Sequence, residues 1–359
     1  MQIWDEQLAP FLAQISPPSQ QAMDQAQQQW DSVAKPLGSL GLLEQAVIRI
    51  AGCCGRADLQ VRPRAVLVFC ADNGVVREGV TQTGSEVTAL VAKNMTRGEA
   101  SVCHMAALAD AEVIPVDMGM ENPVPGCLDR RIAAGTGNIA QGPAMTREQA
   151  CQAIRTGIEL VRERQAQGYH LLVTGEMGIG NTTTASAVTA ALLGLDPARV
   201  SGRGAGLSDQ GLTKKISVIR QALAVNQPNP EDPVDILAKV GGFDIGAMTG
   251  VFLGGGLYQV PVLLDGVISA AAALLAARLC PNSRKAMVAT HTSAEPAAQL
   301  ILAELGLEAP IQAGLRLGEG SGAVCFLPLL DMALAVYGEM STFHQIGLAP
   351  YEHLEKKPC

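Results

Sequence analysis

The sequence is poor in aromatic rings and in charges. Phe, Trp and Tyr together make up 3% of the 359 residues, and Asp, Glu, Lys and Arg make up 17%. Hydrophobic residues account for 48%, which excludes intrinsic disorder because a disordered chain is charged and has few apolar residues. With so few rings, we expect a core of aliphatic, Ala and Gly residues in which helices pack closely against a sheet.

Basic residues are also scarce. There are 26 Lys and Arg against 34 Asp and Glu, which gives a formal net charge of −8. This balance argues against a nucleic-acid-binding protein, which needs a basic surface. The nine cysteines form no C-x-x-C motif, so we expect reduced thiols that are mostly buried. The five histidines form no H-E-x-x-H motif or other ligand cluster, so we expect no metal site.

Signals for export or for a membrane span are missing as well. Met1–Gln20 has no basic region followed by an apolar core, so we expect a cytoplasmic protein. Ile245–Leu264 is uncharged and 20 residues long, but Gly254-Gly-Gly256 and Pro261 interrupt it. We interpret this run as the end of a helix followed by a strand, with no membrane span. The spacing Gly250-x-x-x-Gly254 predicts close helix packing.

The hydrophobic pattern predicts an α/β fold. Residues 1–60 have a helical pattern, and from residue 64 onward apolar runs of strand length alternate with helical stretches, which is typical of a parallel sheet covered on both faces. We expect a doubly wound, mostly parallel, Rossmann-like sheet. The predicted strands are Ala65–Cys70, Val113–Val116, Leu171–Thr174, Val262–Leu264, Met287–Ala289 and Leu315–Leu317, and the predicted helices after residue 64 include Glu86–Ala109, Thr146–Gln167, Thr182–Leu193 and Gly266–Leu279.

The length and the helical ends predict the domain organisation. A chain of 359 residues is long enough for about two domains. We expect a large α/β domain over residues 61–335. Residues 1–60 and 336–359 together would form a small helical lobe.

Polar residues and glycines follow all six predicted strands. Asp72, Asp117, Glu176, Asp265, His291 and Glu319 stand at these ends, each near Gly or a hydroxyl residue. Ligands of open parallel sheets bind at the carboxyl ends of the strands. The alternative is that these residues only cap the loops between strands and helices. That alternative explains one or two such strand ends well, but six of them less well.

The segment Gly175–Thr184 follows a predicted strand and opens a predicted helix. Its glycines allow backbone N–H groups to approach a ligand, and a helix N-terminus favours phosphate. Neither the Walker A motif nor the dinucleotide fingerprint is present, which favours a monophosphate over ATP or NAD. An ordinary glycine turn with a cap explains this segment equally well. Gly202–Gly206, with Lys214 and Lys215 downstream, is a second basic loop that could complete the site or be a mobile turn.

Two glutamates in these loops are candidate catalytic residues. Glu319 is flanked by Gly318 and Gly320, so a substrate could come close to its carboxylate, as a general base requires. Glu176 lies in the glycine loop, where a carboxylate suits a hydroxyl, a proton or a cationic ring. Either one alone could be a solvent-facing loop acid. His291 and Ser293 do not form a serine-hydrolase triad, because no Gly-x-Ser-x-Gly motif is present.

Nine distinctive segments follow one another from about residue 30 to about residue 340. They are Lys35-Pro-Leu-Gly-Ser-Leu-Gly-Leu-Leu-Glu44, Cys70-Ala-Asp-Asn-Gly-Val75, Asn94-Met-Thr-Arg-Gly98, Gly137-Asn-Ile-Ala140, Asn181-Thr-Thr183, Asn226-Gln-Pro-Asn-Pro230, Lys239-Val-Gly-Gly-Phe-Asp244, Pro261-Val-Leu-Leu-Asp-Gly266 and Arg316-Leu-Gly-Glu-Gly-Ser-Gly322. This ordered set resembles the nicotinate-nucleotide–dimethylbenzimidazole phosphoribosyltransferase family of cobalamin lower-ligand assembly.

This resemblance implies transfer of the 5-phosphoribosyl group of nicotinate mononucleotide to a lower-ligand base, with inversion at the anomeric carbon and release of nicotinate. It implies Glu319 as the base and Glu176 as a second active-site acid. It further implies a homodimer without metal or organic cofactor. The residues implied for phosphate and ribose are Gly178, Asn181, Thr182, Gly202, Lys215 and Ser293, and those implied for the acceptor base are Asp72, Thr83, Val91 and Leu317.

The acceptor pocket departs from the family pattern. Many members have Asp-His-Gly-Val where this chain has Asp72-Asn73-Gly74-Val75, and enterobacterial-type members have Ser-Pro and Gln where it has Thr83-Gly84 and Val91. The preferred base therefore stays open. A two-subunit relative that activates phenols and an inactive nucleotide-binding module are the alternatives. A dinucleotide dehydrogenase is disfavoured because its fingerprint is absent.

Overall fold

A six-stranded parallel sheet forms the centre of the molecule. The computed structural model describes residues 6–353. The strand order is β3-β2-β1-β4-β5-β6, so the chain builds outward from β1 in one direction and then from β4 in the other. This confirms the predicted doubly wound parallel sheet. The strands are β1 (Arg64–Ala71), β2 (Glu112–Gly119), β3 (Leu128–Asp129), β4 (Leu171–Met177), β5 (Val262–Leu264) and β6 (Met287–Ala289).

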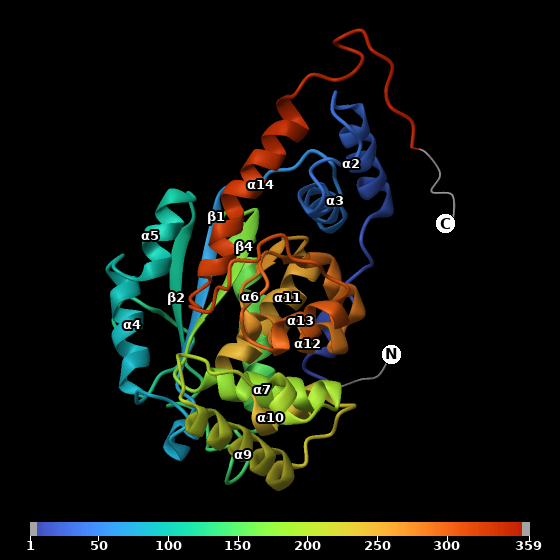
Figure 1. Cartoon of the computed structure of the whole chain (residues 1–359). Helices are drawn as coiled ribbons and strands as arrows, with labels where there is room; N and C mark the ends of the chain where they lie inside the picture. Colours follow the sequence, from blue (N-terminus) through green and yellow to red (C-terminus); the bar gives the residue numbers. More distant parts are fainter. Residues whose placement is uncertain (1–5, 354–359) are drawn as a thin grey trace.

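Helices cover both faces of the sheet, with α4 and α5 on one side and α11, α12 and α13 on the other (Figure 1). The α-helices are α1 (Ala9–Leu12), α2 (Gln20–Ser32), α3 (Leu42–Cys54), α4 (Glu86–Thr96), α5 (Ser101–Leu108), α6 (Arg147–Ala166), α7 (Asn181–Leu193), α8 (Pro197–Val200), α9 (Asp209–Asn226), α10 (Pro233–Val240), α11 (Phe243–Tyr258), α12 (Val267–Leu279), α13 (Ala297–Leu305) and α14 (Ser321–Glu339). Two 3₁₀ helices, η1 (Gly74–Glu78) and η2 (Pro281–Ala286), complete the described elements.

Side chains of β1 alternate between two cores. Leu67 and Phe69 belong to the core shared with α6, α7 and α10–α13. Val66 and Val68 belong to the core shared with α2–α5 and α14. Successive residues of a strand point to opposite faces, and all eight residues of β1 are buried. The uninterrupted apolar run in the sequence is therefore the signature of a strand covered on both sides.

Five of the six predicted strands are confirmed, and the sixth is wrong. Leu315–Leu317 is an extended loop between Gly314 and Gly318, whose φ angles are +66° and +92°. Glycines in this left-handed region turn the chain at both ends, so the short apolar pattern never pairs as a strand. The side chain of Leu317 is 57% exposed. The two-residue strand β3 was not predicted, because it is too short to show a period.

The predicted helices after residue 64 are confirmed with one change. Glu86–Ala109 is not continuous but divides into α4 and α5 around Gly98, whose φ is +74°. The helix predicted from Thr146 is α6, and it starts with a capping box between Thr146 and Gln149. The helical pattern of the first 60 residues corresponds to α1, α2 and α3, with residues 33–41 as a loop between the last two.

The Gly-rich apolar run forms α11 and β5. A Cβ atom on Gly250 would lie 1.9 Å from the carbonyl oxygen of Ile154, and one on Gly254 would lie 3.0 Å from Val161. Both neighbours belong to α6, so the prediction of close helix packing is confirmed. The triple glycine does not end the helix, however. α11 continues through it to Tyr258, and β5 follows from Val262, so the predicted helix end and strand both lie within this run.

The two ends of the chain meet on one side of the molecule. The backbone N–H of Ala34 donates to the carbonyl of Ser341 at 3.0 Å, and the rings of Trp30 and Tyr337 touch edge to face with centroids 5.0 Å apart. Helix α14 crosses the predicted boundary at residues 335 and 336. The division into a lobe and a main domain stays a prediction, and its residues 1–5 and 354–359 lie outside the described part.

Helix α14 also raises the question of a membrane span. Within residues 6–353 it is the one helix that is long and apolar enough to cross a bilayer, judged by length and composition alone. Half of it is buried in the fold. The buried guanidinium of Arg64 binds Asp331 of this helix at 2.7 and 2.8 Å. A core helix passes the same length test, so the feature is weak support for a span.

The cysteines are buried less often than predicted. Of the eight in the described range, Cys53, Cys70, Cys151 and Cys280 are buried, and the other four are partly exposed. The expectation that most are buried is therefore met by half of them.

Candidate active site

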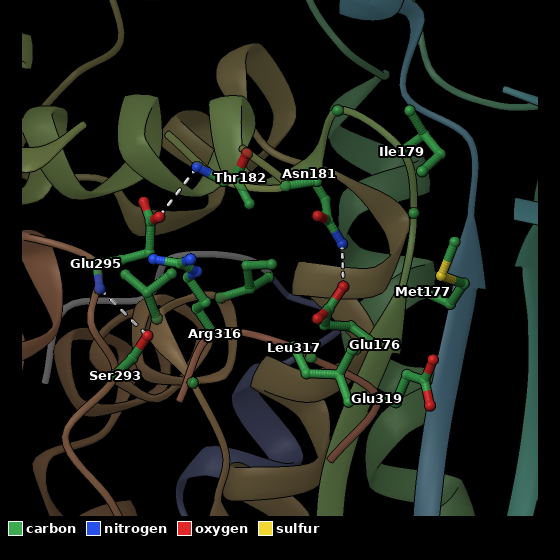
Figure 2. A pocket seen from close by; sticks show the side chains of 18 of the residues that line it. Glu176, Met177, Ile179, Asn181, Thr182, Ser293, Glu295, Arg316, Leu317 and Glu319 are labelled. Atoms are coloured by element: carbon green, nitrogen blue, oxygen red, sulfur yellow. Dashed lines mark hydrogen bonds between the residues drawn. The ribbon is translucent and has the colours of Figure 1, made fainter. Parts of the chain in front are cut away.

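A cavity of about 280 Å³ opens at the carboxyl ends of β4, β5 and β6. Its walls come from the loops after these strands, from residues 80–83 and from residues 203–207. Thr182, Ser293, Glu295 and Arg316 lie toward one side of the view in Figure 2, and Met177 and Glu319 lie toward the other. The position agrees with the rule that doubly wound sheets bind ligands at this edge.

Glu176 lies at the end of β4 and is 8% exposed. Its Oε2 atom accepts a short hydrogen bond from the Nδ2 atom of Asn181, which also donates to Oδ2 of Asp244 at 3.0 Å (Figure 2 shows the first of these bonds). Burial raises the pKa of Glu176 well above the usual range, although the bond from Asn181 opposes this, and the carboxylates of Asp244, Asp265 and Glu319 raise it further. Burial therefore disfavours the ionised form of Glu176 in the free protein, while the bond from Asn181 favours it.

Glu319 lies in the loop before α14 and has a φ of +63°, which is rare for a residue other than glycine. Two contacts hold it there. Its backbone N–H donates to the carbonyl of Glu176 at 3.2 Å, and its Oε2 accepts the N–H of Val102, in the first turn of α5, at 3.0 Å. Burial is the main cause that raises the pKa of Glu319, against the bond from Val102. The strain at this position is consistent with a functional residue.

Asp265, which follows β5, accepts backbone N–H groups at the start of α14. Asp265 Oδ1 accepts the N–H groups of Gly322 and Ala323 at 2.9 and 3.1 Å, and Oδ2 accepts that of Gly320 at 3.2 Å. Asp265 thus caps α14 and fixes the loop that carries Glu319. Burial raises its pKa, while His291 opposes this shift.

Two other strand-end acids are caps as well. Asp117 Oδ1 accepts the N–H groups of Gly119 and Met120, each at 2.9 Å, and Asp72 Oδ2 accepts that of Glu121 at 2.8 Å. Asp72, Asp117 and Asp265 thus all accept backbone N–H groups of loops, and Asp265 also lines the cavity. The predicted contact of Asp72 with the acceptor base stays a prediction.

The N-terminus of α7 and a buried lysine form the basic side of the site. Lys215 Nζ donates to Oγ1 of Thr182 at 2.8 Å and to the carbonyl of Gly202 at 3.1 Å. Burial lowers the pKa of Lys215 to about 8. Glu295 Oε1 accepts the N–H of Gly204 at 3.0 Å, which ties the loop after α8 to the loop after β6. A cation and a helix N-terminus at one place suit a phosphate group.

The opposite side of the cavity is apolar. Val80, Val91, Met177, Ile179 and Leu317 contribute to this wall. None of the described residues that line the cavity is Phe, Tyr or Trp. A flat ring would therefore be held by aliphatic side chains and by the sulfur of Met177, which makes favourable contacts with aromatic rings.

The cavity contains most of the predicted site residues. Nine of them line it, namely Thr83, Val91, Glu176, Gly178, Asn181, Thr182, Ser293, Leu317 and Glu319. Lys215 and Gly202 do not line the cavity. Lys215 donates to Thr182, which does line it, and to the carbonyl of Gly202. Asp72 does not line the cavity either. The side-chain amide of Asn181 donates to the carboxylates of Glu176 and Asp244, so it positions Glu176. Its predicted contact with the phosphate or ribose stays a prediction.

Among the residues in or beside the cavity that the predicted site omitted, four charged ones stand out. Arg203, Glu295 and Arg316 line it, and Asp244 binds Asn181 from behind. Arg203 lies in the basic loop, and Arg316 and Asp244 lie in family motifs, so their positions were visible although their roles were not. No signal marked Glu295. In residues 6–353, no three His, Cys, Asp or Glu side chains gather into a group that could hold a metal ion.

Fold and site together define the class: a doubly wound α/β protein with a small-molecule cavity that joins paired carboxylates, a basic helix N-terminus and an apolar wall. The sequence model of a family described as "Phosphoribosyltransferase" matches residues 15–348. The chain belongs to this family, whose relatives are named nicotinate-nucleotide–dimethylbenzimidazole phosphoribosyltransferase.

Several relatives carry that enzyme name. The one from Ruminiclostridium cellulolyticum is 45% identical over 337 residues, covering 93% of this chain and 96% of the relative. One from Escherichia coli is 46% identical over 336 residues, covering 93% and 94%. The crystal structure of CobT from Thermus thermophilus superposes with a TM-score of 0.87 at 41% identity, covering 92% of this chain and 99% of that one.

Proposed function

We propose that this chain transfers the 5-phosphoribosyl group of nicotinate mononucleotide to 5,6-dimethylbenzimidazole, or to a related lower-ligand base. The products are α-ribazole 5′-phosphate and nicotinate. The observation that carries the proposal is the pairing of Glu176 and Glu319 in one cavity that also has a basic side and an apolar side. The names of relatives that match almost the whole chain support the same reaction.

In the proposed reaction, a ring nitrogen of the base attacks the anomeric carbon of the ribose. The new C–N bond forms as the bond to the pyridinium nitrogen breaks, and that electron pair neutralises the pyridinium. The leaving group therefore needs no proton. The other ring N–H of the base becomes acidic as positive charge develops on the ring, and Glu319 takes this proton as the general base.

Glu176 would stabilise positive charge on the nucleotide. A pyridinium or a developing charge on the ribosyl carbon favours an ionised carboxylate nearby. Binding of the cationic nucleotide would therefore lower the raised pKa of Glu176. Asn181 is placed to stabilise this carboxylate, because it already donates to it.

The phosphate and ribose would lie at the other side of the cavity. The N-terminus of α7 offers backbone N–H groups near Gly178 and Thr182, and Lys215 supplies a positive charge through Thr182. Ser293 and Arg316 line the same part of the cavity. We propose that the enzyme works as a cytoplasmic homodimer and uses no metal or organic cofactor.

The proposal is tested by incubating the protein with nicotinate mononucleotide and a panel of bases: dimethylbenzimidazole, benzimidazole, adenine and p-cresol. We expect an α-ribotide of dimethylbenzimidazole by mass spectrometry, with one nicotinate released per ribotide. Reaction with p-cresol alone, above all with a co-expressed paralogue, would favour the phenol-activating relative. Absence of product with every base would overturn the proposal and favour a nucleotide-binding module.

The raised pKa of Glu319 predicts the acidic limit of activity. A general base works in its ionised form, so activity is present above its pKa and lost as the pH falls through it. We expect kcat/KM to decline at a pH above the ordinary glutamate value of about 4.3, because burial raises the pKa of Glu319. A profile of kcat/KM between pH 4 and 8, with circular dichroism at each pH, measures this limit. The same decline in the Glu319→Gln protein would assign it to another group.

A further inference from the structure

A second cavity, of about 700 Å³, lies between α3, η2 and the end of α13. It shares no lining residue with the candidate active site. Its size is within the range of sites for small organic ligands. The reaction proposed above makes no use of it.

This cavity is basic although the chain is acidic overall. Arg49, Arg284 and Lys285 line it, against a single carboxylate, that of Glu308. Lys285 is 5% exposed and both arginines are half-buried, whereas Glu308 is exposed. The cavity therefore concentrates about three positive charges in a site that is partly shielded from water.

In the part of the chain that the structure describes, two of the three cations donate to neutral oxygens. Arg49 Nη1 donates to the carbonyl of Arg284 at 3.2 Å, and Lys285 Nζ donates to Oγ of Ser16 at 3.1 Å. The Nε atom of Arg284 is buried and has no hydrogen-bond partner. Burial lowers the pKa of Arg49 and of Lys285. Desolvated cations of this kind are normally paired with an anion, and in the described chain none of these three forms an ion pair with a carboxylate.

The remaining walls are apolar. Leu42, Ile48, Val288 and Leu307 line the cavity together with three prolines. Two guanidinium groups and an ammonium group match a phosphate dianion better than a single carboxylate, because arginine donates to phosphate with two parallel N–H groups. The apolar wall would cover an organic group attached to that phosphate.

We propose that this cavity is a second binding site, for an organic phosphate whose phosphate group is held by Arg49, Arg284 and Lys285 and whose apolar part lies against Leu42, Ile48 and Leu307. The site stands apart from the reaction cavity, and the proposal does not depend on the proposed function. β6 joins the two regions, because it follows Lys285 by two residues and leads to His291 of the reaction cavity.

Calorimetric titration with 1-naphthyl phosphate tests the proposal, in the presence of saturating nicotinate mononucleotide so that the first cavity is occupied. We expect binding of one naphthyl phosphate per chain, with inorganic phosphate and 1-naphthol each at least tenfold weaker. The double variant Arg49→Gln/Arg284→Gln should weaken binding at least tenfold. Arg278→Gln removes an exposed arginine paired with Glu304, outside the cavity, and should change nothing.

A second variant keeps the test decisive if the double variant fails to fold. Ala303 lies exposed at the rim of the cavity, so Ala303→Trp would fill the opening and leave the cations in place. We expect this variant to lose binding too. Unchanged binding in Ala303→Trp, or binding of 1-naphthol as tight as that of its phosphate, would overturn the proposal. Loss of naphthyl phosphate binding on addition of the nucleotide would place the ligand in the first cavity and would also overturn the proposal.

Discussion

Replacing Glu319 with Gln is expected to lower kcat by about 10²- to 10⁴-fold, the usual contribution of a general base. The amide has nearly the same shape and can still accept the N–H of Val102 through its oxygen, as the carboxylate does at 3.0 Å. The loop and the cavity should therefore persist while the proton acceptor is lost. We expect KM for nicotinate mononucleotide to change by only a few fold.

Initial rates and calorimetric binding of the nucleotide measure these two effects separately. Glu304→Gln is the matched control, because Glu304 is an exposed acid on α13 that pairs with Arg278. It should keep full activity. A Glu319→Gln protein that turns over at the wild-type rate would exclude Glu319 as the base. Equal, negligible turnover of both proteins and of the wild type would instead indicate a binding module.

Adding one methyl group at Gly175 is expected to lower kcat by about 10- to 100-fold, although this residue has no side chain to contribute to the chemistry. Gly175 lies in β4, and a Cβ atom on it would lie 2.5 Å from the carbonyl oxygen of Glu319 and 3.0 Å from the N atom of Gly320. Gly175→Ala must therefore displace the loop that carries the base. A misplacement of about 1 Å in an active site can cost about 10²-fold in rate.

The size of this effect is read from kcat, with thermal unfolding measured alongside. Gly142→Ala is the control, because a Cβ atom there meets nothing within 4 Å, so both activity and stability should be kept. We expect the pH limit of kcat/KM to shift in Gly175→Ala, because the environment of Glu319 changes. A stable Gly175→Ala protein with unchanged kcat would show that the loop position does not control the reaction.

Much of the fold could be predicted from the sequence because local patterns and tertiary environment agree. Val262–Leu264 and Met287–Ala289 are predicted as strands and occur with these bounds, since short apolar runs between helices have no other place in a doubly wound sheet. Leu315–Leu317 has the same pattern, but the turns at Gly314 and Gly318 keep it from pairing with the edge strand β6. The break between α4 and α5 depends on one glycine turn, which a helical pattern on both sides conceals.

The candidate site was predictable in part. Glycine neighbours and strand ends marked Glu176 and Glu319, and both line the cavity. The same marks also selected Asp72 and Asp117, which cap loops. Residues that position another residue of the site could not be predicted, because the residue that each one contacts is far away in the sequence. Asp244 meets Asn181 across 63 positions, and Glu295 meets Gly204 across 91.

The shortage of aromatic residues already determined that the core is aliphatic and rich in Ala and Gly. The apolar runs of strand length that alternate with helical stretches determined that the fold is α/β. The hydrophobic period and the order of the motifs can be read along the chain. The sequence alone therefore specified a doubly wound parallel sheet covered by helices on both faces, and the family. Only the tertiary structure decided which acids accept backbone N–H groups of loops and which meet in the cavity, and that one wall of the cavity is aliphatic. Those outcomes depend on distances between segments far apart in the chain, which packing sets.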